Sequence, residues 1–109
     1  MTLQKFIENC RELSIDEIRS SQDDQFEAVF FTRDIADWLK ALEPFIGEPK
    51  KGEGVKPTRE DKKVSSRYGG IWKEQTLFYK DCENGRIVAM FWPWQDSQRT
   101  TLKMYVEEK

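Results

Sequence analysis

The sequence contains no histidine, and this absence excludes more function classes than any other feature of its composition. Without an imidazole, the chain cannot form a Ser-His or Cys-His nucleophile pair, an HExxH zinc site or a facial iron triad. Carboxylates, Lys, Tyr and Cys remain as acid–base groups, and each needs a shifted pKa to act near neutrality. We therefore favour a non-enzymatic protein and assign no catalytic residue, metal site or cofactor.

Cysteine and long apolar runs are also scarce. Cys10 and Cys82 stand alone without CxxC spacing, which predicts free, buried thiols rather than a disulfide framework or a thiolate metal site. The longest apolar run extends only from Ala28 to Phe31, too short to cross a bilayer. The amino terminus lacks the apolar region of a signal peptide. We expect a cytoplasmic protein with no membrane partner.

Aromatic side chains compensate for a low apolar content. The 109 residues include seven Phe, four Trp and three Tyr, and 18 basic against 20 acidic side chains give a net charge of −2. Each aromatic side chain can bury roughly 150–250 Å². This composition is typical of a folded protein, and we expect residues 1–109 to form a single domain.

Two stretches carry the apolar spacing of an amphipathic helix. Residues 3–13 and 33–43 each place apolar side chains along one face, and Pro44 is expected to end the second helix. Between them, Ser14 to Glu17 resembles a capping box and predicts a short helix that includes Ile18.

Residues 47–67 have a different character. They hold seven basic and four acidic side chains but only two aliphatic ones, Val55 and Val64. Such a segment cannot form a core by itself, which predicts a long, charged, exposed and mobile loop. Its basic residues include Lys50, Lys51, Lys56 and Arg59.

The remaining segments have the composition of strands. Residues 26–31 predict one strand, and 72–80, 86–94 and 99–106 predict a meander with hairpins at Asn84-Gly85 and Asp96-Ser97. The expected fold is α+β: an antiparallel β-meander of three to four strands with two or three helices packed on one face.

The hairpin register places the side chains of the meander on two faces, because side chains alternate along a strand. The first face is apolar and is expected to pack against the helices: Phe78, Cys82, Ile87, Ala89, Phe91, Leu102, Met104 and Val106. The second face is amphipathic: Leu77, Tyr79, Val88, Met90, Trp92, Thr101, Lys103 and Tyr105, with Trp94 beyond. Three coverings are open for it, namely the loop or the strand 26–31 region, a second copy of the chain, or a ligand.

Tyr and Trp combine apolar rings with hydrogen-bonding tips, which suits a binding surface. Our leading prediction is a small protein-interaction module that binds a protein partner or itself. The alternative is single-stranded nucleic-acid binding by the same face together with the basic loop 50–67. No motif is specific enough to name a family. The predicted binding residues are Tyr79, Met90, Trp92, Trp94, Lys103 and Tyr105, with Lys50, Lys51, Lys56 and Arg59 in the basic loop.

Overall fold

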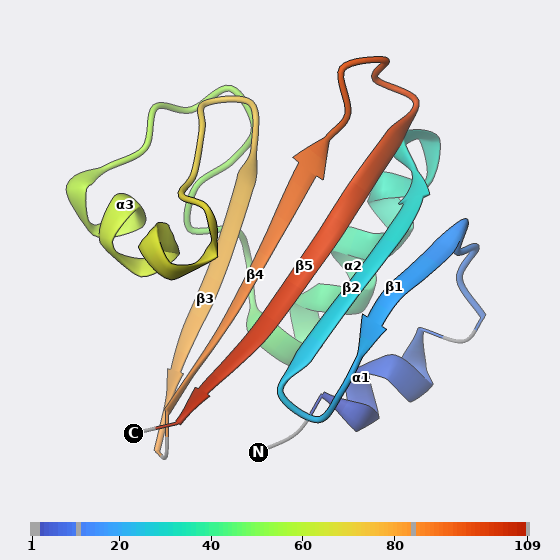
Figure 1. Cartoon of the computed structure of the whole chain (residues 1–109), viewed down its shortest axis with the longest axis horizontal. Coiled ribbons are helices and arrows are strands. Elements are labelled where there is room, and N and C mark those ends of the chain that lie inside the picture. The colour runs from blue at the N-terminus through green and yellow to red at the C-terminus, as the bar shows by residue number, and fades with distance from the viewer. Residues whose placement is uncertain (1–2, 11, 84, 109) are drawn as a thin grey trace.

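The computed structural model describes residues 3–10, 12–83 and 85–108, and its main element is a five-stranded antiparallel sheet. The strands lie in the order β1-β2-β5-β4-β3, so the last three strands of the chain form a meander (Figure 1). The α+β class is confirmed, while the predicted number of strands is too low. The strands are β1 (Glu17–Ser21), β2 (Gln25–Phe31), β3 (Thr76–Cys82), β4 (Gly85–Pro93) and β5 (Arg99–Glu108).

The hairpin of β3 and β4 is shifted by two residues from the predicted register. Phe78 lies opposite Ala89 instead of Phe91, and Gly85 is the first residue of β4 instead of part of the turn. A shift of two residues leaves every side chain on the same face, because the side-chain period of a strand is two. The hairpin of β4 and β5 has the predicted register. Both predicted faces are therefore confirmed.

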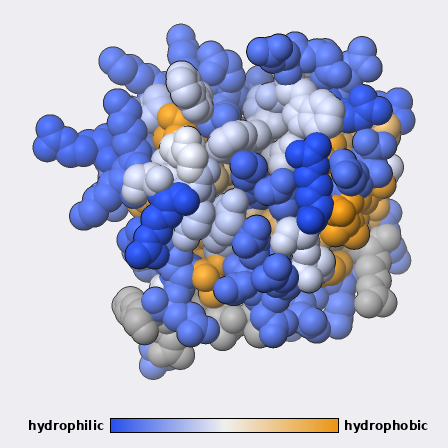
Figure 2. Space-filling view, viewed as in Figure 1, coloured by the Kyte–Doolittle hydropathy of each residue, from blue (hydrophilic) through white to orange (hydrophobic). Residues whose placement is uncertain are grey.

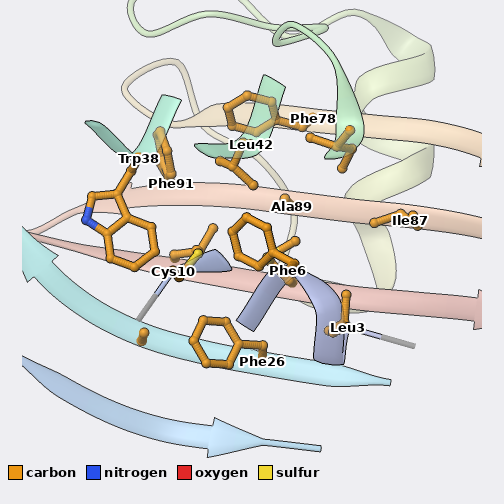
Figure 3. Close-up of a cluster of buried hydrophobic side chains, with 14 of the residues drawn as sticks. Leu3, Phe6, Cys10, Phe26, Trp38, Leu42, Phe78, Ile87, Ala89 and Phe91 are labelled. Carbon is orange, nitrogen blue, oxygen red and sulfur yellow. The ribbon is translucent and has the colours of Figure 1, made fainter. Parts of the chain in front are cut away.

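The first face of the sheet packs against α1 (Gln4–Asn9) and α2 (Ile35–Ile46). Figure 3 shows Phe6 of α1 and Trp38 of α2 pointing into one cluster of buried side chains. Phe30 of β2 stacks on Trp38, with ring centroids 4.9 Å and ring planes 20° apart. Large aromatic rings thus fill the main core, as the composition predicts.

The predicted bounds of these two helices are partly wrong. α1 ends at Asn9, well before residue 13, and Arg11 of the predicted helix lies outside the described residues. A 3₁₀ turn, η1 (Thr32–Asp34), precedes α2, which continues through Pro44 to Ile46. The hydrogen bond that Pro44 cannot donate falls in the last turn of α2, where burial of Ile46 favours continuing the helix.

The segment from Ser14 to Ile18 does not form the predicted helix, because β1 occupies its end. Ile18 lies opposite Ala28 of β2, and a register irregularity follows between Ile18 and Ser20. The capping-box pattern is only a local preference, whereas pairing with β2 supplies a ladder of backbone hydrogen bonds. β1 is therefore an edge strand beside β2.

Residues 47–75, which we call the cover segment, follow α2, pair with the edge strand β3 at Lys51, and pack Val64, Tyr68 and Ile71 against the second face of the sheet. The predicted loop at 47–67 therefore contains a helix and four buried residues, while most of its other residues are exposed as predicted. Its mobility stays a prediction. Helix α3 (Arg59–Ser65) begins at a capping box: the backbone N–H of Asp61 donates to Thr58 Oγ1 at 3.1 Å, and the N–H of Thr58 donates to Asp61 Oδ2 at 2.9 Å. Figure 1 shows α3 beside β3 and far from α1, so the expectation that all helices pack on one face is wrong.

The cover segment completes a second, smaller apolar cluster that its own few aliphatic residues could not form. The sheet supplies three of its buried members, Leu77, Val88 and Met90, and the cover segment supplies Val64 and Ile71. Tyr68 of the 3₁₀ turn η2 (Ser66–Tyr68) stacks on Tyr105 of β5, with centroids 4.0 Å and ring planes 10° apart. The chain itself therefore covers the second face over β3 and β4, the first of the three alternatives.

Both cysteines are free, as predicted. Cys10 is only 1% exposed, and burial raises the pKa of its thiol to about 12. Cys82 is partly buried, so its predicted burial is incomplete. No helix within residues 3–10, 12–83 and 85–108 is long and apolar enough to span a membrane.

Candidate functional site

The predicted binding residues divide into buried, partly covered and accessible groups. Met90 is 0% exposed and Lys51 is 1% exposed, so neither can touch a partner of the folded chain. Tyr79 and Tyr105 are partly buried where they pack against the second apolar cluster. The others keep accessible surface: Trp92, Trp94 and Lys103 in part, and Lys50, Lys56 and Arg59 more fully.

Trp92 marks the border between the covered and the open parts of the second face. A Cβ atom placed on Gly69 of the cover segment would lie 3.0 Å from Trp92 Cη2, so the backbone approaches the indole closely. The Lys103 Nζ atom lies 3.7 Å from the centroid of the Trp92 ring, a cation–π contact. The indole N–H of Trp92 is buried without a hydrogen-bond partner among the described residues.

Beyond this border, the surface over β5, β2 and β1 is not covered by any helix, and we call it the open half (Figure 1). β2 and β5 bring Phe31 opposite Arg99 there. The Arg99 guanidinium carbon lies 5.2 Å from the centroid of Phe31 and 5.8 Å from that of Trp94. The Arg33 guanidinium carbon lies 5.0 Å from the Phe31 centroid, and that of Arg19 lies 5.5 Å from the Trp94 centroid. These residues alternate as Arg33, Phe31, Arg99, Trp94 and Arg19, which we name the arginine–aromatic row.

Hydrogen bonds fix the Trp94 ring within this row. Its indole N–H donates to Thr101 Oγ1 at 2.9 Å, and its backbone N–H donates to the carbonyl of Arg99 at 2.8 Å. Thr101 is only 4% exposed and its neighbour across the strands, Val29, is 0% exposed. Long side chains of the row therefore shield the middle of the open half from water.

Acidic side chains hold two of the three arginines. Arg99 Nε donates to Asp16 Oδ2 at 3.0 Å, and Arg19 Nε donates to Glu17 Oε2 at 3.3 Å. Arg19 Nη1 also lies 4.0 Å from Glu27 Oε2. Each guanidinium carries five N–H donors, so these contacts leave others free for a partner. Figure 2 shows this face as blue and near-white side chains with scattered orange and no broad orange patch. The surface is thus amphipathic, and it combines rings with fixed arginines.

A buried lysine holds the cover segment beside this surface. Lys51 Nζ donates to the carbonyl oxygens of Gly52 at 2.8 Å and Lys73 at 2.9 Å, and also to the carbonyl of Gln75. The backbone of Lys51 exchanges hydrogen bonds with Leu77 of β3. Burial lowers the pKa of Lys51, against the opposing attraction of Asp61, Glu74 and Glu53. Lys51 is a structural residue rather than part of a basic binding loop.

Four members of the row are missing from the sequence-based site: Phe31, Arg33, Arg99 and Arg19. Trp94 is the member that sequence reasoning did select. The other four come together only because β2 pairs with β5 and β1 pairs with β2. The sequence alone predicts neither of these pairings. Their local pattern carries no signal of the row.

A comparison of the chain with models of protein families, with curated proteins and with solved structures finds no match. The class of the fold is therefore defined by the structure itself, as an α+β fold with a five-stranded antiparallel sheet and helices on both faces.

Proposed function

We propose that the protein is a non-enzymatic, cytoplasmic protein-interaction module that binds its partner through the arginine–aromatic row. The observation that supports this most is the alternation of three arginines and two rings on a sheet surface left open by the rest of the chain. Trp and Arg are enriched among residues that dominate the energetics of protein interfaces. The free thiols of Cys10 and Cys82 support a reducing compartment.

The row is preorganised, which favours binding over a merely solvated surface. The bonds of Trp94 to Thr101 and of Arg99 to Asp16 hold both side chains before a partner arrives. A rigid contact side chain loses less rotamer entropy on binding, so more of its contact energy contributes to affinity. Lys103 and Trp92 extend the same surface toward the cover segment.

Selection of a random-peptide phage library against the protein tests this proposal. Residues that dominate an interface lie in well-packed contacts, so we expect selected peptides to lose about tenfold or more in affinity for Trp94→Ala and for Arg19→Ala. Ile18→Ala is the matched control, because Ile18 is 54% exposed on β1 and does not belong to the row. Peptides that bind all three variants and the wild type equally contradict the proposal.

Single-stranded nucleic-acid binding is the alternative. Accessible Lys50, Lys56 and Arg59 favour it. Against it, the Trp94 ring already carries Arg19 and Arg99, so a base would have to displace a guanidinium before stacking. Fluorescence anisotropy with a labelled oligothymidine at low salt separates the two functions. Strand binding that requires both Trp94 and Arg59 contradicts the protein-binding proposal.

A further inference from the structure

A hollow of about 560 Å³ lies at the end of the sheet where the cover segment meets the β4–β5 loop. Trp72, Glu53, Glu74 and Gln75 of the cover segment line it on one side. Pro93, Trp94, Gln95 and Ser97 line it from β4 and the loop that follows. Trp94 therefore belongs both to this hollow and to the arginine–aromatic row.

The exposure of Trp72 is the first observation that marks the hollow as a binding site. The residue is 65% exposed, more than any other large hydrophobic side chain in the described part of the chain. Two hydrogen bonds hold its backbone: its N–H donates to Gln75 Oε1 at 2.9 Å and its carbonyl accepts from the N–H of Gln75 at 3.0 Å. The indole thus extends into solvent from a held backbone position beside the hollow, where a ligand can cover its exposed apolar surface.

The charge of the lining is the second observation. Glu53 and Glu74 are its only ionisable side chains, and among the described residues neither forms an ion pair with a basic side chain. Lys51 lies close enough to attract both, but it is buried and its ammonium donates to backbone carbonyls. The lining itself therefore carries two carboxylates and no basic side chain beside an exposed ring.

Trp94 shows that rings in this region attract cations. Two guanidinium groups, those of Arg19 and Arg99, already lie within 6 Å of its centroid. A cation between an indole and a carboxylate gains both from the ring quadrupole and from the opposite charge. The hollow offers this combination at Trp72, since the Trp94 ring is already in contact with two guanidinium groups.

We propose that the hollow binds a lysine or arginine side chain of an extended segment in a partner protein. The inference rests on the proposed function, because it names the chemistry of the partner segment that lies beside the arginine–aromatic row. An indole contacts the methylene groups and the cation, while Glu53 and Glu74 receive the donated hydrogen bonds. Continuity with the row through Trp94 favours a residue of a bound protein over a free amine.

Titration with short capped peptides tests this inference. The probes are acetyl-Ala-Ala-Xaa-Ala-Ala-amide with Xaa as lysine, arginine, norleucine or glutamate, and the readout is the ¹H–¹⁵N signals of the indole groups. Norleucine keeps the aliphatic chain but lacks the charge. We expect the lysine and arginine peptides to shift the Trp72 and Trp94 signals with a Kd about tenfold lower than the norleucine peptide.

Variants assign this binding to the hollow. Trp72→Ala and Glu74→Gln are each expected to weaken the lysine peptide about fivefold or more. Ile18→Ala is the matched control for loss of an exposed apolar side chain, and Glu12→Gln is the control for loss of one surface charge. Equal binding of the norleucine or glutamate peptide, no binding of any peptide, or binding unchanged by Trp72→Ala overturns the inference.

This result is separable from the test of the proposed function. Arg19 belongs to the row and not to the hollow, whereas Trp72 belongs to the hollow and not to the row. Phage-selected peptides that need Arg19 but show no preference for a basic residue contradict only the inference. Lysine binding that needs Trp72, together with selected peptides indifferent to Arg19, contradicts only the use of the row.

Discussion

Lys51→Met is expected to lower the free energy of unfolding by about 3 kcal/mol at pH 7, although the change removes a buried charge. The amine of Lys51 is the shared donor for three backbone carbonyls, two of them in the 73–75 stretch. Without it, these carbonyls lose a hydrogen-bond donor, and the start of the cover segment is no longer bonded to its end at residues 73–75. The substitution also removes the desolvation cost of the buried ammonium, but this gain offsets only part of the loss.

Urea unfolding followed by fluorescence measures the effect, and Lys56→Met is the matched control. Lys56 lies in the same segment but is exposed, so its replacement is expected to change the unfolding free energy by less than about 0.5 kcal/mol. If both variants unfold at the same urea concentration, Lys51 does not hold the cover segment.

The pH dependence of this difference has a defined sign. Burial lowers the pKa of Lys51 in the folded protein below its ordinary value of 10.5. Between the two pKa values the unfolded chain binds a proton that the folded chain does not, so the contribution of Lys51 to stability rises with pH. The deficit of Lys51→Met relative to wild type is therefore expected to widen as the pH approaches 10.5.

Gly85→Ala is expected to lower the free energy of unfolding by about 3 kcal/mol, because the strand has no room for a side chain there. A Cβ atom on Gly85 would lie 1.9 Å from the carbonyl oxygen of Glu107 and 3.1 Å from the Cα atom of Glu108. Both atoms belong to the backbone of β5, which cannot rotate away as a flexible side chain can. The end of the β4–β5 ladder would have to open.

Gly52→Ala is the control for this substitution. Its Cβ atom would meet only Val55 Cγ2, at the ordinary contact distance of 3.8 Å, so the unfolding free energy is expected to change by no more than about 0.5 kcal/mol. Thermal unfolding of the two variants side by side gives the comparison. A Gly85→Ala protein as stable as Gly52→Ala contradicts the close approach of the two strands.

Gly85 also explains why the register of the first hairpin was predicted incorrectly. Asn-Gly is a strong turn signal, so the sequence places Gly85 in the turn. In the structure Gly85 lies in β4, where its lack of a side chain allows the backbone of β5 to approach closely. Asn84, the other half of the signal, lies outside the described residues. The faces were nevertheless predicted correctly, since an error of two residues preserves the alternation.

The cover segment shows a different limit of sequence reasoning. Its aliphatic residues are too few for a core, and this count suggested a mobile loop. The count omitted what the sheet contributes: Leu77, Val88 and Met90 need only Val64 and Ile71 to complete a cluster. The capping box at Thr58 and Asp61 was a visible local signal for α3, whereas the buried role of Lys51 has no local signal at all.

The candidate site was predictable only in part for the same reason. Trp92, Trp94 and Lys103 follow from strand alternation within the meander. Arg19 and Arg99 lie far apart in sequence, and they approach the same ring only once β1 and β2 have joined the sheet. Long-range strand order, rather than composition or periodicity, therefore determines where the arginines lie.

Hydrogen exchange of the four indole N–H groups tests most directly whether the chain itself covers part of the second face. The N–H groups of Trp38 and Trp92 are buried, whereas Trp72 is 65% exposed. We expect Trp38 and Trp92 to exchange slowly and Trp72 quickly. We expect Lys51→Met to accelerate Trp92 more than Trp38, because it opens the cover segment locally as well as lowering the global stability. Exchange at Trp92 as fast as at Trp72 in the wild-type protein would contradict the division of the face into covered and open halves.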